Sequence, residues 1–267
     1  MSVSNPPQTF QNKVIAITGA SRGIGLAVTK HLIARGATVS MCATSSENLT
    51  KALDEIHQEF PEAKDRVMTC IVDISKLETV RSWIEQTVAK FGPLDGCCNN
   101  AGKEQRKLYP MTDLDADYFH DLINVNVCGL FHCLKEEMKV IKDGGSIVNL
   151  GSTASNYASA GSSAYITAKH AVLGLTKTAA FEGAPRGIRV NAMCPGPTNT
   201  TMMNQAFETA NGDFYLTEEN TPSLLKRRAE PEEVATLIAF LLGDDSKFIT
   251  KATYYMDGGW LEGNYTS

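Results

Sequence analysis

Short apolar runs alternate along the chain with longer stretches in which apolar residues recur at helical spacing. The short runs are almost continuously hydrophobic, which is typical of strands covered on both faces. They predict strands over Val14–Ile17, Thr38–Ala43, Val67–Val72, Leu94–Cys98, Ser146–Leu150, Arg189–Met193 and Thr253–Met256. The longer stretches predict helices over Gly25–Arg35, Glu47–Phe60, Leu77–Phe91, Phe119–Val140, Ala164–Phe181 and Pro231–Leu242. Such alternation predicts a single-domain, doubly wound α/β fold, a seven-stranded parallel sheet with helices on both faces.

Three segments fall outside this alternation. Residues 1–12 are polar and hold two adjacent prolines, so they predict a flexible N-terminal segment before a single domain over 13–267. Residues 103–117 form a polar connection. Residues 199–230 are long and weakly periodic but carry several large apolar side chains, which predicts a lid over an apolar ligand, with a subunit contact as the alternative.

Composition narrows the range of partners. The chain has 267 residues, a net charge of −5 and no run of 18 apolar residues, which argues against nucleic acid and membrane as partners. Its seven cysteines include no C-x-x-C pair, and no secretory signal precedes the first strand, so a cytoplasmic protein with reduced thiols is expected. The five histidines show no metal-ligand spacing, so no metal site is expected.

A glycine-rich turn follows the first predicted strand and leads into a helix. Gly19, Gly23 and Gly25 lie in the sequence Thr-Gly-Ala-Ser-Arg-Gly-Ile-Gly. Glycines at such a turn let the backbone approach a pyrophosphate, and the start of the helix directs unpaired N–H groups at the anion. A tight strand-to-helix connection without a ligand is the alternative.

Tyr165 and Lys169 are separated by one helical turn, and Ser152 precedes the tyrosine by thirteen residues. The four-residue spacing places the phenol and the ammonium on one helix face. We expect the ammonium to lower the pKa of the phenol from its usual value of about 10. A tyrosine of this kind can exchange a proton with an alcohol or a ketone oxygen.

Taken together, these motifs resemble those of classical short-chain dehydrogenases/reductases. The glycine turn, Asn99-Asn100-Ala101-Gly102, Ser152, Tyr165-x-x-x-Lys169 and Pro195-Gly196 have the order and spacing of that family from about Gln11 to Trp260. The resemblance implies a Rossmann-type fold and a catalytic set of Asn126, Ser152, Tyr165 and Lys169. Tyr165 would be the general acid or base, and Lys169 would lower the pKa of its phenol. Ser152 would bind the substrate oxygen, and Asn126 would anchor a chain of water molecules. Asn126 as an ordinary helix residue stays open, and Gly151 departs from relatives that often have serine there.

The resemblance also implies which residues contact the cofactor. These are Gly19, Ser21, Arg22, Ile24, Gly25, Thr44, Ser45, Asp73, Asn100, Ala101, Gly102, Tyr165, Lys169, Pro195, Gly196, Thr198 and Thr200. Asp73 has helix capping as its alternative role. NADP(H) is favoured over NAD(H), because Ala43 stands where NAD-specific relatives place a carboxylate and Arg22 can pair with a 2′-phosphate. The alternative for this region is that Thr44 begins a capping box with Glu47 and that Arg22 is a solvated loop residue.

The function implied by the resemblance is hydride transfer between a nicotinamide and the carbonyl or secondary alcohol of a mostly apolar small molecule. A homotetramer built through the helices at 119–140 and 164–181 is expected, with a dimer as the alternative. Two other functional classes stay open, an epimerase or dehydratase of the same fold and a regulatory nucleotide-binding protein without catalysis.

Overall fold

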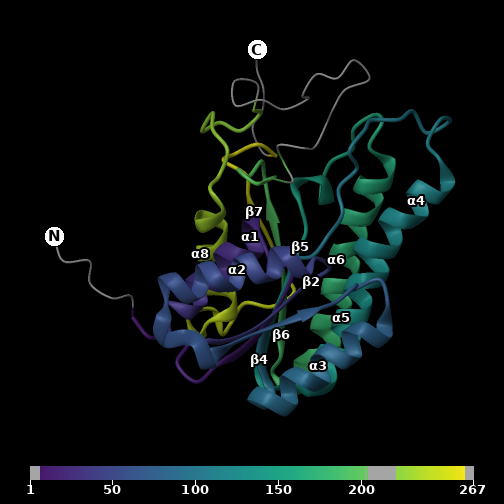
Figure 1. Cartoon of the computed structure of the whole chain (residues 1–267). Helices are drawn as coiled ribbons and strands as arrows, with labels where there is room; N and C mark the ends of the chain where they lie inside the picture. Colours follow the sequence, from purple (N-terminus) through teal and green to yellow (C-terminus); the bar gives the residue numbers. More distant parts are fainter. Residues whose placement is uncertain (1–6, 202, 204–220, 262–267) are drawn as a thin grey trace.

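All the strands predicted from the apolar runs form in the structure, a computed structural model that describes residues 7–201, 203 and 221–261. The strands are β1 (Val14–Thr18), β2 (Thr38–Ala43), β3 (Val67–Ile71), β4 (Leu94–Asn99), β5 (Ile141–Leu150), β6 (Arg189–Pro195) and β7 (Thr253–Met256). They form one parallel sheet in the order β3-β2-β1-β4-β5-β6-β7 (Figure 1). The chain therefore winds outward from β1 to one edge and from β4 to the other, as predicted.

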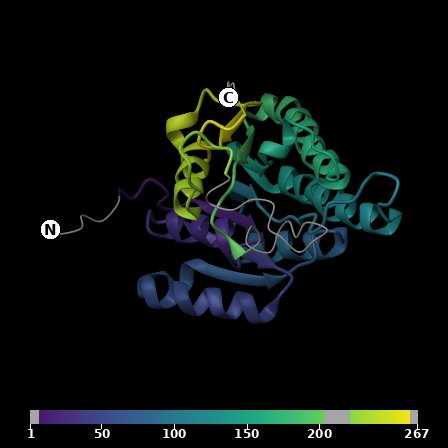
Figure 2. The ribbon, with the colours of Figure 1, turned by 90° about the horizontal axis from the view of Figure 1, so that it is seen from above.

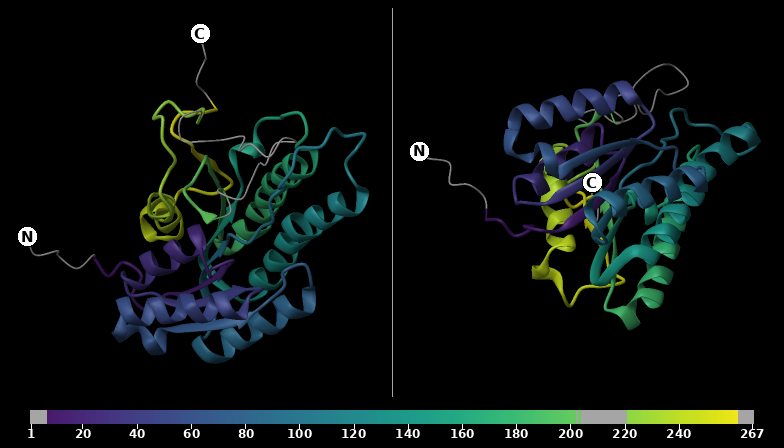
Figure 3. Two further views of the ribbon diagram at one scale, coloured as in Figure 1. Left: turned by 45° about the horizontal axis from the view of Figure 1, so that its top comes forward. Right: turned by 60° about the horizontal axis from the view of Figure 1, so that its bottom comes forward.

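Both faces of the sheet are buried because successive side chains of each strand point to opposite sides. In β1, Ile15 and Ile17 enter one core and Val14 and Ala16 enter the other. The first core is covered by α1 (Gly23–Ile33), α2 (Ser46–Glu59) and α8 (Pro231–Leu242). The second is covered by α3 (Leu77–Phe91), α5 (Gly129–Val140) and α6 (Ser163–Gly183), which gives three layers (Figure 2). Although far apart in sequence, α1 and α8 pack side by side (Figure 3).

The helix predicted over Phe119–Val140 forms, but it begins at Ala116 and contains a π-helical turn that was not predicted. The chain forms α4 (Ala116–Ile123), then a π-helical turn η2 (Asn124–Cys128), then α5. The cause is Asn126, whose Nδ2 donates to the carbonyl oxygens of Leu122 at 3.0 Å and of Lys103 at 2.8 Å. A side chain inserted beside the helical hydrogen bonds widens the turn, and such turns are frequent at functional sites.

The other predicted helices form with ends shifted by up to two residues. Four short 3₁₀ turns complete the described elements: η1 (Pro61–Arg66), η3 (Thr153–Ser155), η4 (Ala184–Arg186) and η5 (Asp244–Ser246). Of the segment predicted to be flexible, residues 7–12 are described, and Phe10 is buried in the first core. Most of the predicted lid, residues 202 and 204–220, lies outside the described residues.

The two ends of the predicted lid segment are held together. The backbone N–H of Asn199 donates to the Ala229 carbonyl at 2.8 Å, and that of Ala229 donates to the Pro197 carbonyl at 2.9 Å. These bonds join residues at the two ends of the segment close to the carboxyl end of β6.

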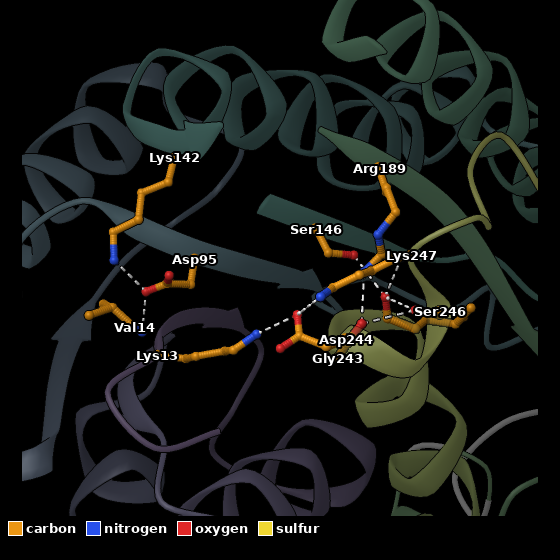
Figure 4. A network of polar contacts seen from close by, with 11 residues as sticks. Lys13, Val14, Asp95, Lys142, Ser146, Arg189, Gly243, Asp244, Ser246 and Lys247 are labelled. Atoms are coloured by element: carbon orange, nitrogen blue, oxygen red, sulfur yellow. Dashed lines mark hydrogen bonds and ion pairs between the residues drawn. The ribbon is translucent and has the colours of Figure 1, made fainter. Parts of the chain in front are cut away.

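Polar contacts fix the amino ends of the strands, the edge of the sheet away from the strand carboxyl ends (Figure 4). The Asp95 carboxylate accepts from the backbone N–H of Val14 at 2.9 Å and from Lys142 Nζ at 2.8 Å. Buried Arg189 donates to the carbonyl of Gly243 at 3.0 Å, which holds the end of α8 against β6.

Candidate active site

A cavity of about 450 Å³ lies at the carboxyl ends of the central strands, a size in the usual range for small-molecule sites. In open α/β sheets this edge is where ligands bind, at the point where the strand order reverses. Here the reversal lies between β1 and β4. Nearly all the residues predicted for the site line the cavity: Gly19, Ser21, Arg22, Ile24, Thr44, Asp73, Asn100, Ala101, Gly102, Asn126, Ser152, Tyr165, Lys169, Pro195, Gly196, Thr198 and Thr200. Gly25 and Ser45 are not among the lining residues.

The glycine turn is held against the segment after β4. Gly19 and Gly23 have φ angles of +64° and +53°, a region that favours glycine. A Cβ on Gly25 would lie 2.3 Å from the Gly19 carbonyl oxygen, so Gly25 allows the helix to pack on the turn. Asn100 Nδ2 braces the turn by donating to the carbonyls of Thr18 and Gly19, each at 3.1 Å.

The start of α1 offers an anion site. Arg22 occupies the N-cap position in extended conformation, and no side chain caps the helix. The first turn of α1 holds no acidic residue. Its first N–H groups and the positive end of the helix dipole therefore favour a negatively charged group such as a phosphate.

At the end of β2 the cavity wall carries no carboxylate. Ala43 and Thr44 line it there, and the exposed Arg22 lines it from the glycine turn. Ser45 is instead the N-cap of α2, where its Oγ accepts from the Asn48 N–H at 3.2 Å. The capping alternative for this region thus applies to Ser45 and not to Thr44.

Asp73 both lines the cavity and shapes the loop after β3. Its Oδ1 accepts from the backbone N–H and the hydroxyl of Ser75 at 3.1 and 2.6 Å, which lowers the pKa of the Asp73 carboxyl. The N-cap of α3 is Lys76, so Asp73 is not that cap.

Ser152 and Tyr165 meet at the carboxyl end of β5. Ser152 begins η3, and its Oγ accepts from the Ala154 N–H at 3.2 Å. Tyr165, in the first turn of α6, lies near Ser152, whose hydroxyl acts to lower the pKa of the phenol. Two hydroxyl groups therefore face the cavity side by side, an arrangement that can hold one carbonyl or alcohol oxygen.

The pKa of Tyr165 departs from the sequence-based expectation. The structure raises it above the usual value, because burial disfavours the phenolate and the nearby Glu104 carboxylate adds to the effect. The nearby Ser152 hydroxyl opposes both effects but is weaker. The expected lowering by Lys169 is therefore wrong for these side chains as they stand.

Lys169 is buried under Tyr165, with Nζ 5.6 Å from the centre of the phenol ring. That Nζ donates to the Leu150 carbonyl at 3.0 Å. Burial lowers the pKa of Lys169 to about 8, and the Cys194 and Glu104 side chains oppose that shift. Burial thus makes the charged form of Lys169 costly, which limits how far its charge can lower the pKa of Tyr165.

Asn126 lies near Lys169 and is bonded to the segment that follows β4. Its Oδ1 accepts from the Lys103 N–H at 3.0 Å, while its Nδ2 holds the Lys103 carbonyl. A second cavity of about 10 Å³ lies between Asn99, Asn126 and Lys169, which is about the space of one water molecule. The alternative that Asn126 is an ordinary helix residue does not fit these contacts.

Gly151 packs closely against Cys194 on β6. A Cβ at position 151 would lie 2.4 Å from Cys194 Sγ. The cysteine thus occupies the space that a larger residue at 151 would need, directly behind Ser152.

Sequence reasoning missed several side chains that line the same cavity, among them Glu104, Tyr157 and Trp260. The rings of Tyr157 and Trp260 are 5.2 Å apart between centres, although 103 positions separate them in sequence. Glu104 belongs to the polar connection, where a single acidic residue has no distinguishing spacing. Only the three-dimensional fold brings these residues to the site.

Among the described residues no helix is both long and apolar enough to cross a membrane. Within the part of the chain that the structure describes, no group of three or more histidine, cysteine, aspartate or glutamate side chains could hold a metal ion.

Comparison with known proteins gives consistent matches over most of the chain. A family model described as enoyl-(acyl carrier protein) reductase matches residues 19–261. The protein named short-chain dehydrogenase/reductase aba4 from Botryotinia fuckeliana (strain B05.10) is 39% identical over 256 residues, which cover 95% of this chain and 98% of the relative. The crystal structure of levodione reductase has a TM-score of 0.85 at 32% identity, covering 93% of this chain and 97% of that one. A blue fluorescent protein from a metagenomic library, solved in complex with NADPH, has a TM-score of 0.84 at 30% identity, covering 95% and 99%.

Proposed function

Because the chain belongs to the classical short-chain dehydrogenase/reductase family, we propose that it transfers hydride between NADP(H) and the carbonyl or secondary alcohol of a mostly apolar small molecule. The observation that carries this proposal is the convergence of Ser152, Tyr165 and Lys169 on the cavity that the glycine turn also lines. Neither an epimerase nor a regulatory protein has an observation of its own in its favour.

Each reacting side chain has a role that its position supports. The Ser152 hydroxyl would hold the substrate oxygen and stabilise the charge that develops on it. Tyr165 would donate its proton to that oxygen during ketone reduction. During alcohol oxidation it would accept the proton of the substrate hydroxyl. The raised pKa of Tyr165 keeps the phenol protonated at neutral pH, as the donor in a reduction must be. Bound nicotinamide would supply or accept the hydride.

Lys169 and Asn126 would serve the proton that Tyr165 exchanges. The Lys169 amine lies under the phenol ring, and a water in the small cavity could join it to Asn126. Such a connection would return a proton to the tyrosine after each turnover.

The choice of NADP(H) rests on the end of β2 and on Arg22. A carboxylate there would repel a 2′-phosphate, and the cavity wall holds Ala43 and Thr44 instead. Arg22 lines the cavity and can pair with a phosphate. A structural relative solved with NADPH is in accord with this preference. NAD(H) is the alternative.

The remaining proposals concern assembly and surroundings. We propose a homotetramer in which α5 and α6 take part, because Phe131 and Phe181 on these helices are 49% and 66% exposed. The segment 199–230 is proposed as the substrate lid, since Thr200, Thr201 and Met203 near its start line the cavity. A cytoplasmic location is proposed from the cysteine spacing alone.

The test is oxidation of NADPH by the purified protein with a panel of ketones, repeated with Tyr165→Phe. Loss of the general acid should lower kcat by about 10²- to 10⁴-fold. The Kd for NADPH, measured by fluorescence, should change little. Tyr109→Phe removes a hydroxyl outside the residues lining the cavity and serves as the control. A Tyr165→Phe variant as active as the parent protein would contradict the proposed role.

A further inference from the structure

Glu104 is an acidic side chain in the cavity that the proposed reaction does not use. It lines the cavity together with Tyr165 and Lys169, and no hydrogen bond or ion pair joins its carboxyl group to another described residue. Its charge is close enough to raise the pKa of Tyr165, while the Lys169 ammonium acts on the carboxyl in return. A half-buried carboxyl group without a protein partner is costly, so a ligand is its natural partner.

The backbone on both sides of Glu104 is fixed. On one side, the Lys103 N–H and carbonyl are both bonded to the Asn126 side chain. On the other side, buried Gln105 donates through Nε2 to the Gly161 carbonyl at 2.5 Å and accepts through Oε1 from the Tyr165 N–H at 3.3 Å. The backbone from which the Glu104 side chain projects is therefore held at a set position relative to Tyr165.

Neighbouring cations do not neutralise Glu104. The Lys103 ammonium is paired with Asp121 on α4, and Arg106 is exposed. Burial accordingly raises the pKa of Glu104 to about 8, although Lys169 and Arg106 oppose the shift. A carboxyl group with this pKa is mostly neutral at pH 7 and partly ionised above pH 8, and in both states it has an oxygen that accepts a hydrogen bond.

Several side chains of the wall near the reacting hydroxyls are apolar or aromatic. Tyr157 and Trp260 form an aromatic surface, and Ile166 and Met203 add aliphatic contacts. Hydroxyl groups such as those of Tyr157, Ser162 and Thr201 also line the cavity. The Glu104 carboxyl differs from them in being an acidic group whose charge acts on Tyr165.

We propose that Glu104 selects substrates that carry a second hydroxyl group on the carbon skeleton, which donates a hydrogen bond to its carboxyl oxygen. The substrates would thus be hydroxyketones and the corresponding diols. This inference rests on the proposed function and names the substrate class of the same site. A site built to bond a substrate hydroxyl discriminates strongly against the analogue that lacks it, because its own polar group is then left unpaired.

The test compares kcat/KM for cyclohexanone with the values for 2-, 3- and 4-hydroxycyclohexanone, with NADPH as donor. The parent protein should prefer at least one hydroxyketone by about tenfold or more. Glu104→Gln keeps an accepting oxygen and should keep most of that preference, whereas Glu104→Met should reduce the ratio to about one. Because each ratio is taken within one protein, a loss of folded enzyme would lower both rates alike and leave it unchanged. Asp113→Asn, an exposed carboxylate of the same connection, is the matched control.

A second measurement does not depend on turnover. Calorimetric titration of the three cyclohexanediols and of cyclohexanol into the parent protein saturated with NADPH, a complex in which the alcohols cannot be oxidised, should show tighter binding of a diol, and Glu104→Met should abolish the difference. Equal affinities for cyclohexanol and all diols, or a preference that survives in Glu104→Met, would overturn the inference. Equal kcat/KM values for all four ketones would overturn the inference while leaving the proposed reaction intact. Failure of the proposed reaction would show differently, as NADPH oxidation unaffected by Tyr165→Phe.

Discussion

At the scale of single residues, burial decides how the reacting groups titrate. The pKa of Tyr165 rises and that of Lys169 falls to about 8, so both shifts oppose the charged forms. The spacing of the two residues predicts their proximity, and the structure brings them together. The spacing does not predict whether the pKa of Tyr165 rises or falls, because burial and the charge of Glu104 depend on chain segments far away in sequence.

Arg22 gives a prediction about cofactor choice at this scale. Arg22→Ala should weaken binding of NADPH by about tenfold or more and binding of NADH much less, because the lost group would pair with the 2′-phosphate alone. The measurement is the Kd of each cofactor, followed by fluorescence titration. Lys64→Ala removes an equal charge from an exposed position outside the cavity lining and controls for net charge. Equal losses for the two cofactors would remove the phosphate role of Arg22.

The limits of sequence reasoning at the residue scale are clear from Glu104 and Trp260. The glycine turn and the Tyr165–Lys169 pair have fixed spacing, so a single sequence reveals them. Glu104 stands alone in a polar connection, and Trp260 lies near the C-terminus, so neither has a local pattern. Their places in the cavity follow from the meeting of segments that only the folded sheet brings together.

At the scale of elements, the helix between β4 and β5 is where the periodicity misled. Apolar spacing continues through Asn124–Cys128, so the pattern predicts one helix. The π-helical turn arises because Asn126 bonds to Lys103, 23 residues earlier, and a window on the helix alone contains no sign of that partner. The strands were predicted well because burial on both faces leaves a dense local signal in each of them.

The junction of β5 and η3 offers a prediction about packing. Gly151→Ala should destabilise the protein by about 1–3 kcal/mol, since the added methyl group would lie 2.4 Å from Cys194 Sγ. It should also lower kcat, because Ser152 is the next residue. The free energy of unfolding would be measured by urea titration.

Cys194→Ala supplies the matching test of that contact. The smaller side chain makes room for the new methyl group, so the double variant Gly151→Ala/Cys194→Ala should be more stable than the sum of the single changes predicts. A coupling of about 0.5–3 kcal/mol is typical of residues in contact. Strictly additive effects would show that the cysteine does not limit position 151.

At the scale of the whole molecule, a buried chain of polar side chains joins α5 and α6 through strands β4 and β5. Asn99 on β4 donates to Glu137 of α5 at 2.8 Å and to Asn149 of β5 at 3.0 Å. Asn149 in turn donates to Thr176 of α6 at 3.0 Å. The chain ties α5 and α6 to the central strands, so its protonation state bears on the stability of the whole domain.

Glu137 makes that stability depend on pH. Burial raises its pKa from 4.5 to about 7, although the bond from Asn99 and the nearby Cys97 thiol oppose the shift. Because the folded protein holds the proton more tightly than the unfolded chain, this residue favours folding at low pH, and the contribution is lost as pH rises through about 7. The loss is on the order of 3 kcal/mol. Glu137→Gln keeps the acceptor without the charge, so its advantage over the parent protein should grow as pH rises.

Glu136, the neighbouring residue, provides a control of opposite sign. Although burial opposes it, the bond from Lys139 and the charge of Arg81 lower the pKa of Glu136, so its carboxylate favours folding above that pKa. Urea unfolding of both variants between about pH 5 and about pH 8.5 separates the two cases. Glu136→Gln should show a nearly constant deficit across this range, whereas Glu137→Gln should show a gain that increases with pH. A Glu137→Gln curve parallel to that of the parent protein would mean that the buried carboxyl group keeps an ordinary pKa and that the polar chain across the sheet does not titrate.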